Sequence, residues 1–107
     1  MELIQQHIKE LKILCKQFFV SELYLFGSFA VGNPSEDSDI DFVVLFESFN
    51  PLDYFDNYMD FKEALELLFN RDVDLLEMQA IKNPILKKSV ERDKIALYGR
   101  EDTKMAV

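Results

Sequence analysis

The chain has little of what would cross-link it, anchor it or attract nucleic acid. Cys15 is its only cysteine, which excludes an internal disulfide and is typical of a reducing compartment, so we expect a cytoplasmic protein. No apolar run approaches the roughly 20 residues that span a bilayer, and no basic and apolar leader opens the sequence. Only 12 basic residues stand against 20 acidic ones, giving a formal net charge of −8. Because such a surface repels phosphate backbones, neither direct nucleic-acid binding nor a membrane is expected.

Apolar residues, by contrast, are abundant enough for one core. The 107 residues are 49% hydrophobic and fall within the size range of a single domain. We therefore expect one domain over residues 1–99, followed by a flexible tail over residues 100–107.

Hydrophobic periodicity predicts helices that alternate with short strands. Apolar residues recur at helical spacing from Glu2 to Phe18, which predicts one opening amphipathic helix. Asn-Pro pairs at 50–51 and 83–84 predict two further helix starts, the first helix running to about Phe69. Runs of β-branched and aromatic residues predict strands at 22–26, 40–46, 73–77 and 95–98. This order favours an α/β (α+β) fold, a small mixed sheet flanked by helices.

Two aspartates flank Ile40 at the start of the second predicted strand. Side chains two residues apart leave the same face of a strand with Cα atoms about 6.5 Å apart, so Asp39 and Asp41 converge. Two like charges at about 6 Å repel by roughly 3 kcal/mol at an effective dielectric of 20. Mg²⁺, as one ion or as a pair, suits such carboxylates when phosphate and water complete its shell. Alone, this short motif is more often a solvated acidic turn.

A glycine and a serine at the end of the first predicted strand strengthen the case for a nucleotide site. Gly27 permits a sharp turn and close approach of the backbone, and Ser28 can begin a helical turn whose amides face a phosphate. Ten residues separate Ser28 from Asp39. The Gly27-Ser28 turn is thus predicted to bind phosphate, and Asp39 with Asp41 to bind metal.

A third aspartate lies inside the apolar run of the third predicted strand. We expect Asp74 to be buried there, which is costly unless the carboxylate is paired or metal-bound. If this strand lies beside the second, Asp74 completes a cluster with Asp39 and Asp41 and can accept the proton of an attacking hydroxyl. Asp72 is interpreted instead as a strand-entry residue that pairs with Arg71.

These motifs together resemble a known superfamily. Gly27-Ser28, ten residues, Asp39-Ile40-Asp41 and a later Val73-Asp74-Leu75 are similar to the DNA polymerase β nucleotidyltransferases, and most of all to the minimal nucleotidyltransferase (MNT) antitoxins of HEPN/MNT modules. The resemblance implies transfer of AMP from ATP to a tyrosine hydroxyl of a HEPN ribonuclease toxin, with release of pyrophosphate and silencing of that toxin.

The resemblance also implies roles for individual residues and two bound Mg²⁺ ions. Metal binding and catalysis fall to Asp39, Asp41 and Asp74, and triphosphate binding falls to Gly27, Ser28 and Ser38. Asp74 would hold the catalytic ion and activate the nucleophile.

The segment after the Gly-Ser pair departs from the family pattern. Members commonly carry arginines there, whereas this chain has Phe29-Ala30-Val31. Basic residues that could compensate lie elsewhere, at Arg71, Lys82, Lys87, Lys88 and Arg92. Two alternative functions stay open: an antitoxin that neutralises its partner by binding alone, and a transferase acting on a small molecule, which the lack of a following acceptor domain disfavours.

Overall fold

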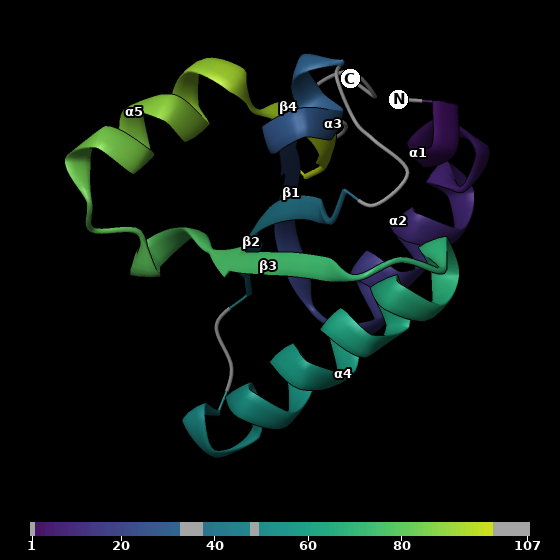
Figure 1. Ribbon diagram of the computed structural model, residues 1–107. Helices are drawn as coiled ribbons and strands as arrows, with labels where there is room; N and C mark the ends of the chain where they lie inside the picture. Colours follow the sequence, from purple (N-terminus) through teal and green to yellow (C-terminus); the bar gives the residue numbers. More distant parts are fainter. Residues whose placement is uncertain (1, 33–37, 48–49, 100–107) are drawn as a thin grey trace, which may run out of the picture.

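The computed structural model describes residues 2–32, 38–47 and 50–99; the predicted tail and most of the loop before Ser38 lie outside them. A four-stranded mixed sheet forms the centre, in the order β3-β2-β1-β4 (Figure 1). Its strands are β1 (Val20–Phe26), β2 (Ile40–Phe46), β3 (Val73–Glu77) and β4 (Ile95–Tyr98). β1 runs antiparallel to β2 and β4, whereas β2 and β3 are parallel. The predicted mixed sheet is confirmed.

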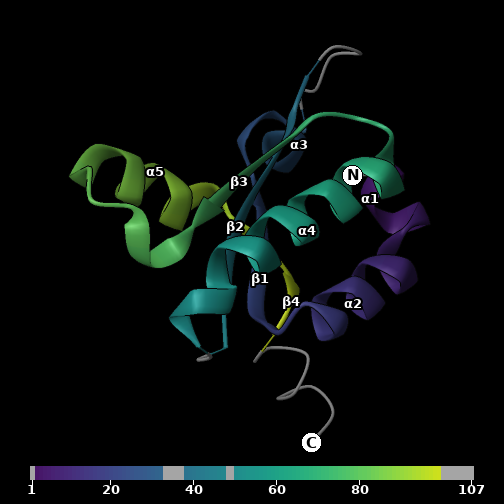
Figure 2. The same ribbon diagram turned by 90° about the horizontal axis from the view of Figure 1, so that it is seen from below.

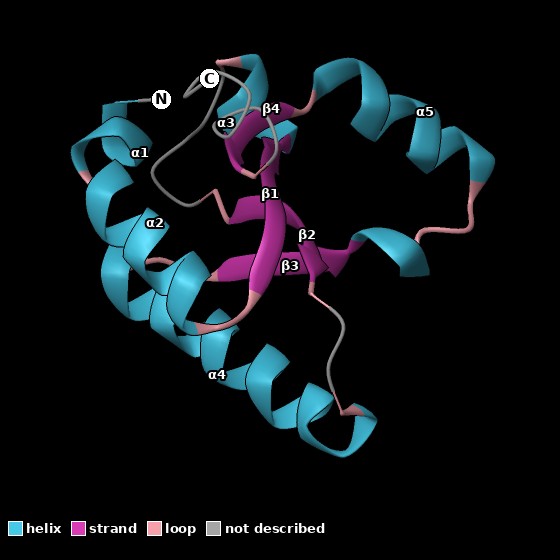
Figure 3. Ribbon diagram, turned by 180° about the vertical axis from the view of Figure 1, so that it is seen from behind, coloured by secondary structure: helices cyan, strands magenta, loops and turns pink. Residues whose placement is uncertain are grey.

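Helices lie on both sides of this sheet. They are α1 (Glu2–Gln6), α2 (Ile8–Gln17), α3 (Gly27–Val31), α4 (Pro51–Phe69) and α5 (Pro84–Asp93), with a short 3₁₀ helix η1 (Met78–Ala80). Viewed from below, α2 and α4 lie on one side of the strands and α5 on the other (Figure 2). The view from behind shows the same separation (Figure 3). No helix within the described ranges is long and apolar enough to cross a membrane.

The opening helix is interrupted, so the prediction of one continuous helix is wrong. His7 separates α1 from α2 with φ −116° and ψ 16°, outside the helical region. A ring nitrogen of His7 donates to the carbonyl oxygen of Leu3 at 3.0 Å, and the ring meets the edge of Phe69 with centroids 5.5 Å apart. A contact with a distant helix therefore accompanies the break.

Both predicted helix starts are confirmed. The Asn50 side chain accepts a hydrogen bond from the amide of Leu52 at 3.0 Å. Asn83 accepts from the amides of Ile85 at 2.9 Å and Leu86 at 3.3 Å. Each asparagine therefore caps amides that the first helical turn leaves unsatisfied, and the following proline needs no amide partner.

Strand register decides which side chains form the core. Leu25 pairs with Phe42, and Phe42 with Leu75, so these three share the face that α2 and α4 cover. The buried side chains of this core are at most 7% exposed: Ile4, Leu11, Cys15, Val20, Leu23, Leu25, Phe29, Ile40, Phe42, Val44, Phe61, Leu65, Phe69, Val73, Leu75 and Leu97. Alternate residues point to the other face, among them Asp41 on β2 and Asp74 on β3.

Candidate functional site

The predicted catalytic aspartates meet on the face of the sheet that α2 and α4 leave uncovered. Asp41 pairs in register with Asp74 on the neighbouring parallel strand and with Phe26 at the end of β1. Adjacent strands lie about 4.8 Å apart, so the two aspartates project side by side. The condition that the third strand lies beside the second is therefore met.

Asp74 is exposed, which corrects the expectation that it is buried. Its neighbours Val73 and Leu75 are 4% and 3% exposed, because they point into the core. Asp74 points the other way, and β3 is an edge strand. The carboxylate therefore needs no buried partner and is accessible to a ligand.

Gly27 brings the backbone against the carboxylate of Asp41. Its φ is +72°, a left-handed conformation that favours glycine. A β-carbon built on Gly27 would overlap Oδ2 of Asp41 and lie 3.1 Å from its Cγ. The helical turn predicted at Ser28 follows at once as α3, so the predicted phosphate-binding and metal-binding elements are in direct contact.

Charge and burial act together on Asp41. Partial burial first, and then the negative charges of Asp74 and Asp39, raise its pKa from 3.8 to about 6. Asp39, exposed just before β2, thus lies close enough to act electrostatically on Asp41. Three mutually repelling carboxylates favour a cation between them.

The arrangement fits a metal ion that is shared with its substrate. Among the described residues, no group of three or more Asp, Glu, His or Cys side chains lies close enough to hold a metal ion on its own. Mg²⁺ is usually held by one or two carboxylates, with phosphate oxygens and water filling the octahedron. Asp41 with Asp39 and Asp74 suits that kind of site, and their roles as metal ligands stay a prediction.

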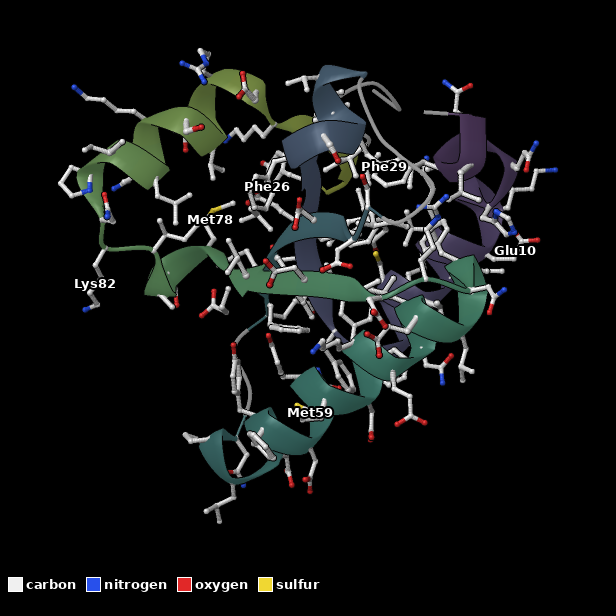
Figure 4. The ribbon with its side chains drawn as sticks, viewed as in Figure 1. Glu10, Phe26, Phe29, Met59, Met78 and Lys82 are labelled. Atoms are coloured by element: carbon white, nitrogen blue, oxygen red, sulfur yellow. The ribbon has the colours of Figure 1, made fainter. Side chains whose placement is uncertain are left out.

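Of the basic residues that could compensate for the missing arginines, Arg71 reaches the site. Its Nη1 donates to the carbonyl oxygen of Ser38 at 3.0 Å, and its guanidinium lies over the ring of Phe29. Arg92 instead pairs with Asp93 on α5 at 3.0 Å. Lys82 lies far to the left of Phe29 in Figure 4. No local pattern favours Arg71 over the other basic residues, because its contacts join segments distant along the chain.

Comparisons with known proteins agree with this geometry. Residues 5–97 match a family model described as a nucleotidyltransferase domain. The chain is 41% identical over 87 residues to a candidate protein adenylyltransferase of Methanocaldococcus jannaschii, covering 81% of this chain and 86% of that protein. The solved structure of a candidate minimal nucleotidyltransferase is 31% identical, with a TM-score of 0.74 over 88% of this chain and 92% of that one.

A further likeness is one of fold. The fold of this chain is similar to that of a chain in the solved complex of the tri-AMPylated Shewanella oneidensis HEPN toxin with an MNT antitoxin, with 20% identity and a TM-score of 0.63. The match covers 95% of this chain and 77% of the chain in that complex.

Proposed function

Because the chain belongs to the nucleotidyltransferase domain family, we propose that it transfers AMP from ATP to a tyrosine hydroxyl of a HEPN-family toxin and so acts as its antitoxin. The observation that carries the proposal is the contact of the Gly27 turn with Asp41, beside Asp74 on the next strand. It sets a turn suited to phosphate against carboxylates suited to metal. The single, buried cysteine is consistent with action in the cytoplasm.

The reaction is a displacement at phosphorus. The oxygen of the acceptor hydroxyl forms a bond to the α-phosphorus of ATP, while the bond from that phosphorus to the oxygen bridging to the β-phosphate breaks. Pyrophosphate leaves, and the hydroxyl proton passes to the carboxylate of Asp74. Positioning and charge stabilisation supply most of the catalysis in such transfers.

The chain's residues divide this work between them. Asp39, Asp41 and Asp74 would hold the two expected Mg²⁺ ions, which when bound neutralise the phosphates and lower the pKa of the attacking hydroxyl. Gly27 lets the chain turn tightly enough for the amides at Ser28 to approach the triphosphate. Ser38 lies just before β2, next to Asp39, and we expect it to contribute to phosphate binding.

The decisive experiment measures AMP on the partner. The purified chain is incubated with labelled ATP, Mg²⁺ and its HEPN-family partner, and the intact mass of both proteins is recorded. We expect one or more AMP units on the partner and none with Asp41→Asn. Asp53→Asn, which changes an exposed aspartate on α4, is the matched control and should transfer normally.

A binding-only antitoxin is the second candidate. The observation that favours it is Phe29-Ala30-Val31, which places no basic side chain directly after the Gly-Ser pair. It predicts a stable complex, no change of mass, and full suppression of toxicity by Asp41→Asn. AMP on the partner that depends on Asp41 excludes this candidate.

A further inference from the structure

Arg71 contacts two segments of the site from a third. It follows Asn70, which ends α4 in a left-handed conformation with φ 53°. From there its Nη1 donates to the carbonyl oxygen of Ser38 at 3.0 Å, and its guanidinium carbon lies 5.3 Å from the ring centroid of Phe29. One half-buried side chain thus joins α3 to the segment that carries Asp39.

Both contacts are with firmly held parts of the fold. Phe29 is 3% exposed and belongs to the hydrophobic core, so close packing holds its ring in place. Two residues after Ser38, the amide of Ile40 donates to the carbonyl oxygen of Asp72 at 3.1 Å. The segment that carries Asp39 is therefore held to residues 71–72 by two hydrogen bonds. The Arg71 side chain binds the carbonyl oxygen of Ser38, and the backbone of Asp72 binds the amide of Ile40.

We propose that Arg71 is a positioning residue that fixes the Gly27-Ser28 turn relative to Asp39 and Asp41. The inference rests on the proposed function. A guanidinium suits this task because it is planar: its face can lie on an aromatic ring while its edge donates a hydrogen bond. A lysine ammonium is a point charge on a flexible stem and cannot make both contacts in the same way.

Two other basic side chains in the described part of the chain, Lys94 and Arg92, make their contacts away from Phe29 and Ser38. The Lys94 ammonium lies 4.5 Å from the ring centroid of Tyr24 on β1 and pairs with Glu91 at 3.1 Å. The Arg92 side chain is 74% exposed and pairs with its neighbour in sequence. Those contacts lie within α5 and its C-terminal end or join that end to β1, whereas the contacts of Arg71 link Phe29 on α3 to Ser38, the residue before Asp39.

A set of four variants separates positioning from charge. Arg71→Gln removes the charge, Arg71→Lys keeps it without the planar group, and Phe29→Leu removes the ring but keeps an apolar core residue. Arg92→Gln is the matched control, an arginine outside the site. Melting temperature, kcat/KM for AMP transfer, and the Kd of Mg²⁺·ATP are measured for each.

Positioning predicts a specific pattern in these measurements. A misplacement of about 1 Å can cost on the order of 100-fold in rate, so Arg71→Gln and Arg71→Lys should both lower kcat/KM by about 10- to 100-fold. Both should also weaken Mg²⁺·ATP binding, with Arg92→Gln unchanged. Phe29→Leu should act in the same direction, and adding Arg71→Gln to it should cost little more, because the two residues act as a unit.

Each contrary outcome has a distinct meaning. If wild type transfers AMP but the Arg71 variants keep its kcat/KM and Kd, the positioning role is wrong and the proposed function stands. If Arg71→Gln lowers kcat/KM and weakens binding but Arg71→Lys keeps the wild-type kcat/KM and Kd, charge alone matters and the positioning role is again wrong. If wild type binds Mg²⁺·ATP without transfer, the proposed function fails while the Kd values still decide the role of Arg71. If wild type binds no Mg²⁺·ATP, both fail.

Discussion

The carboxylate of Asp41 occupies the space that a side chain at position 27 would need. A β-carbon on Gly27 would lie 3.1 Å from Cγ of Asp41 and would overlap its Oδ2. Since the same glycine has φ +72°, two independent constraints exclude other residues there. The turn at the start of α3 and the carboxylate on β2 thus depend on each other's positions.

Gly27→Ala should therefore strongly reduce AMP transfer. The added methyl group must displace Asp41 or the turn, and a shift of about 1 Å predicts a loss on the order of 100-fold in kcat/KM. Gly32→Ala is the matched control, because Gly32 also has positive φ, +81°, yet a β-carbon there meets nothing within 4 Å. It should cost about 1 kcal/mol of stability through backbone strain and leave kcat/KM unchanged. Equal losses of activity in both variants would contradict the contact with Asp41.

Asp41 should make the stability of the metal-free protein depend on pH. Its pKa is raised from 3.8 to about 6, so between these values the folded state binds the proton more tightly than the unfolded state. Stability from this group is therefore greatest at low pH and falls as pH rises towards about 6, above which the loss is constant.

Asp41→Asn isolates that contribution from those of other carboxylates. In a chelator, the variant should melt above wild type at pH 7 to 8, and the difference should vanish near pH 4. Because Asp41 is only partly buried, solvent screening limits the gain to about 1 kcal/mol, or roughly 4–8 °C for a domain of this size. Added Mg²⁺ and ATP should stabilise wild type alone. A difference that does not change with pH would show that the aspartate's charge is not the cause.

Local signals in the sequence were sufficient for most of the fold. Asn50-Pro51 and Asn83-Pro84 specify helix starts through contacts within one turn, so neighbouring residues decide them. The predicted bounds of β2, Ile40–Phe46, are confirmed, and its apolar run ends where its antiparallel partner β1 begins. β1 begins at Val20, two residues before the predicted start, since Val20 pairs with Phe46 across the sheet.

Features that depend on distant contacts could not be predicted in the same way. The break at His7 accompanies a ring contact with Phe69, and the position of Arg71 depends on Ser38 and Phe29. The exposure of Asp74 follows from β3 being an edge strand whose second face the helices α2 and α4 leave uncovered, which no local pattern reveals. The aspartates themselves were identified because their spacing reflects strand geometry.

Asp74→Asn should stop AMP transfer, whereas Asp72→Asn should not. Only Asp74 lies within β3 and in register with Asp41, and Asp72 precedes the strand. Loss of a general base costs about 100- to 10,000-fold, so kcat should fall within that range in Asp74→Asn. Both residues are exposed, so neither change should alter the melting temperature greatly. If Asp72→Asn were the inactive variant, the assignment of the base to Asp74 would be wrong.

Tyr58→Phe should weaken the fold while leaving transfer intact. The Tyr58 hydroxyl donates to the carbonyl oxygen of Leu75 on β3, and the Glu66 carboxylate accepts from the amide of Val73 at 3.1 Å. Side chains of α4 thus form hydrogen bonds with backbone groups on the free edge of this strand. Removing the hydroxyl should cost about 1 kcal/mol, or roughly 4–8 °C in melting temperature. Because an unpaired strand edge can pair with another chain, the variant should also aggregate faster on heating, measurable by light scattering. Its kcat/KM should stay within about threefold of wild type, because the bond holds the edge of β3 that faces away from β2. A large loss of kcat/KM at an unchanged melting temperature would mean that Tyr58 acts on the neighbouring Asp74 and not on the strand.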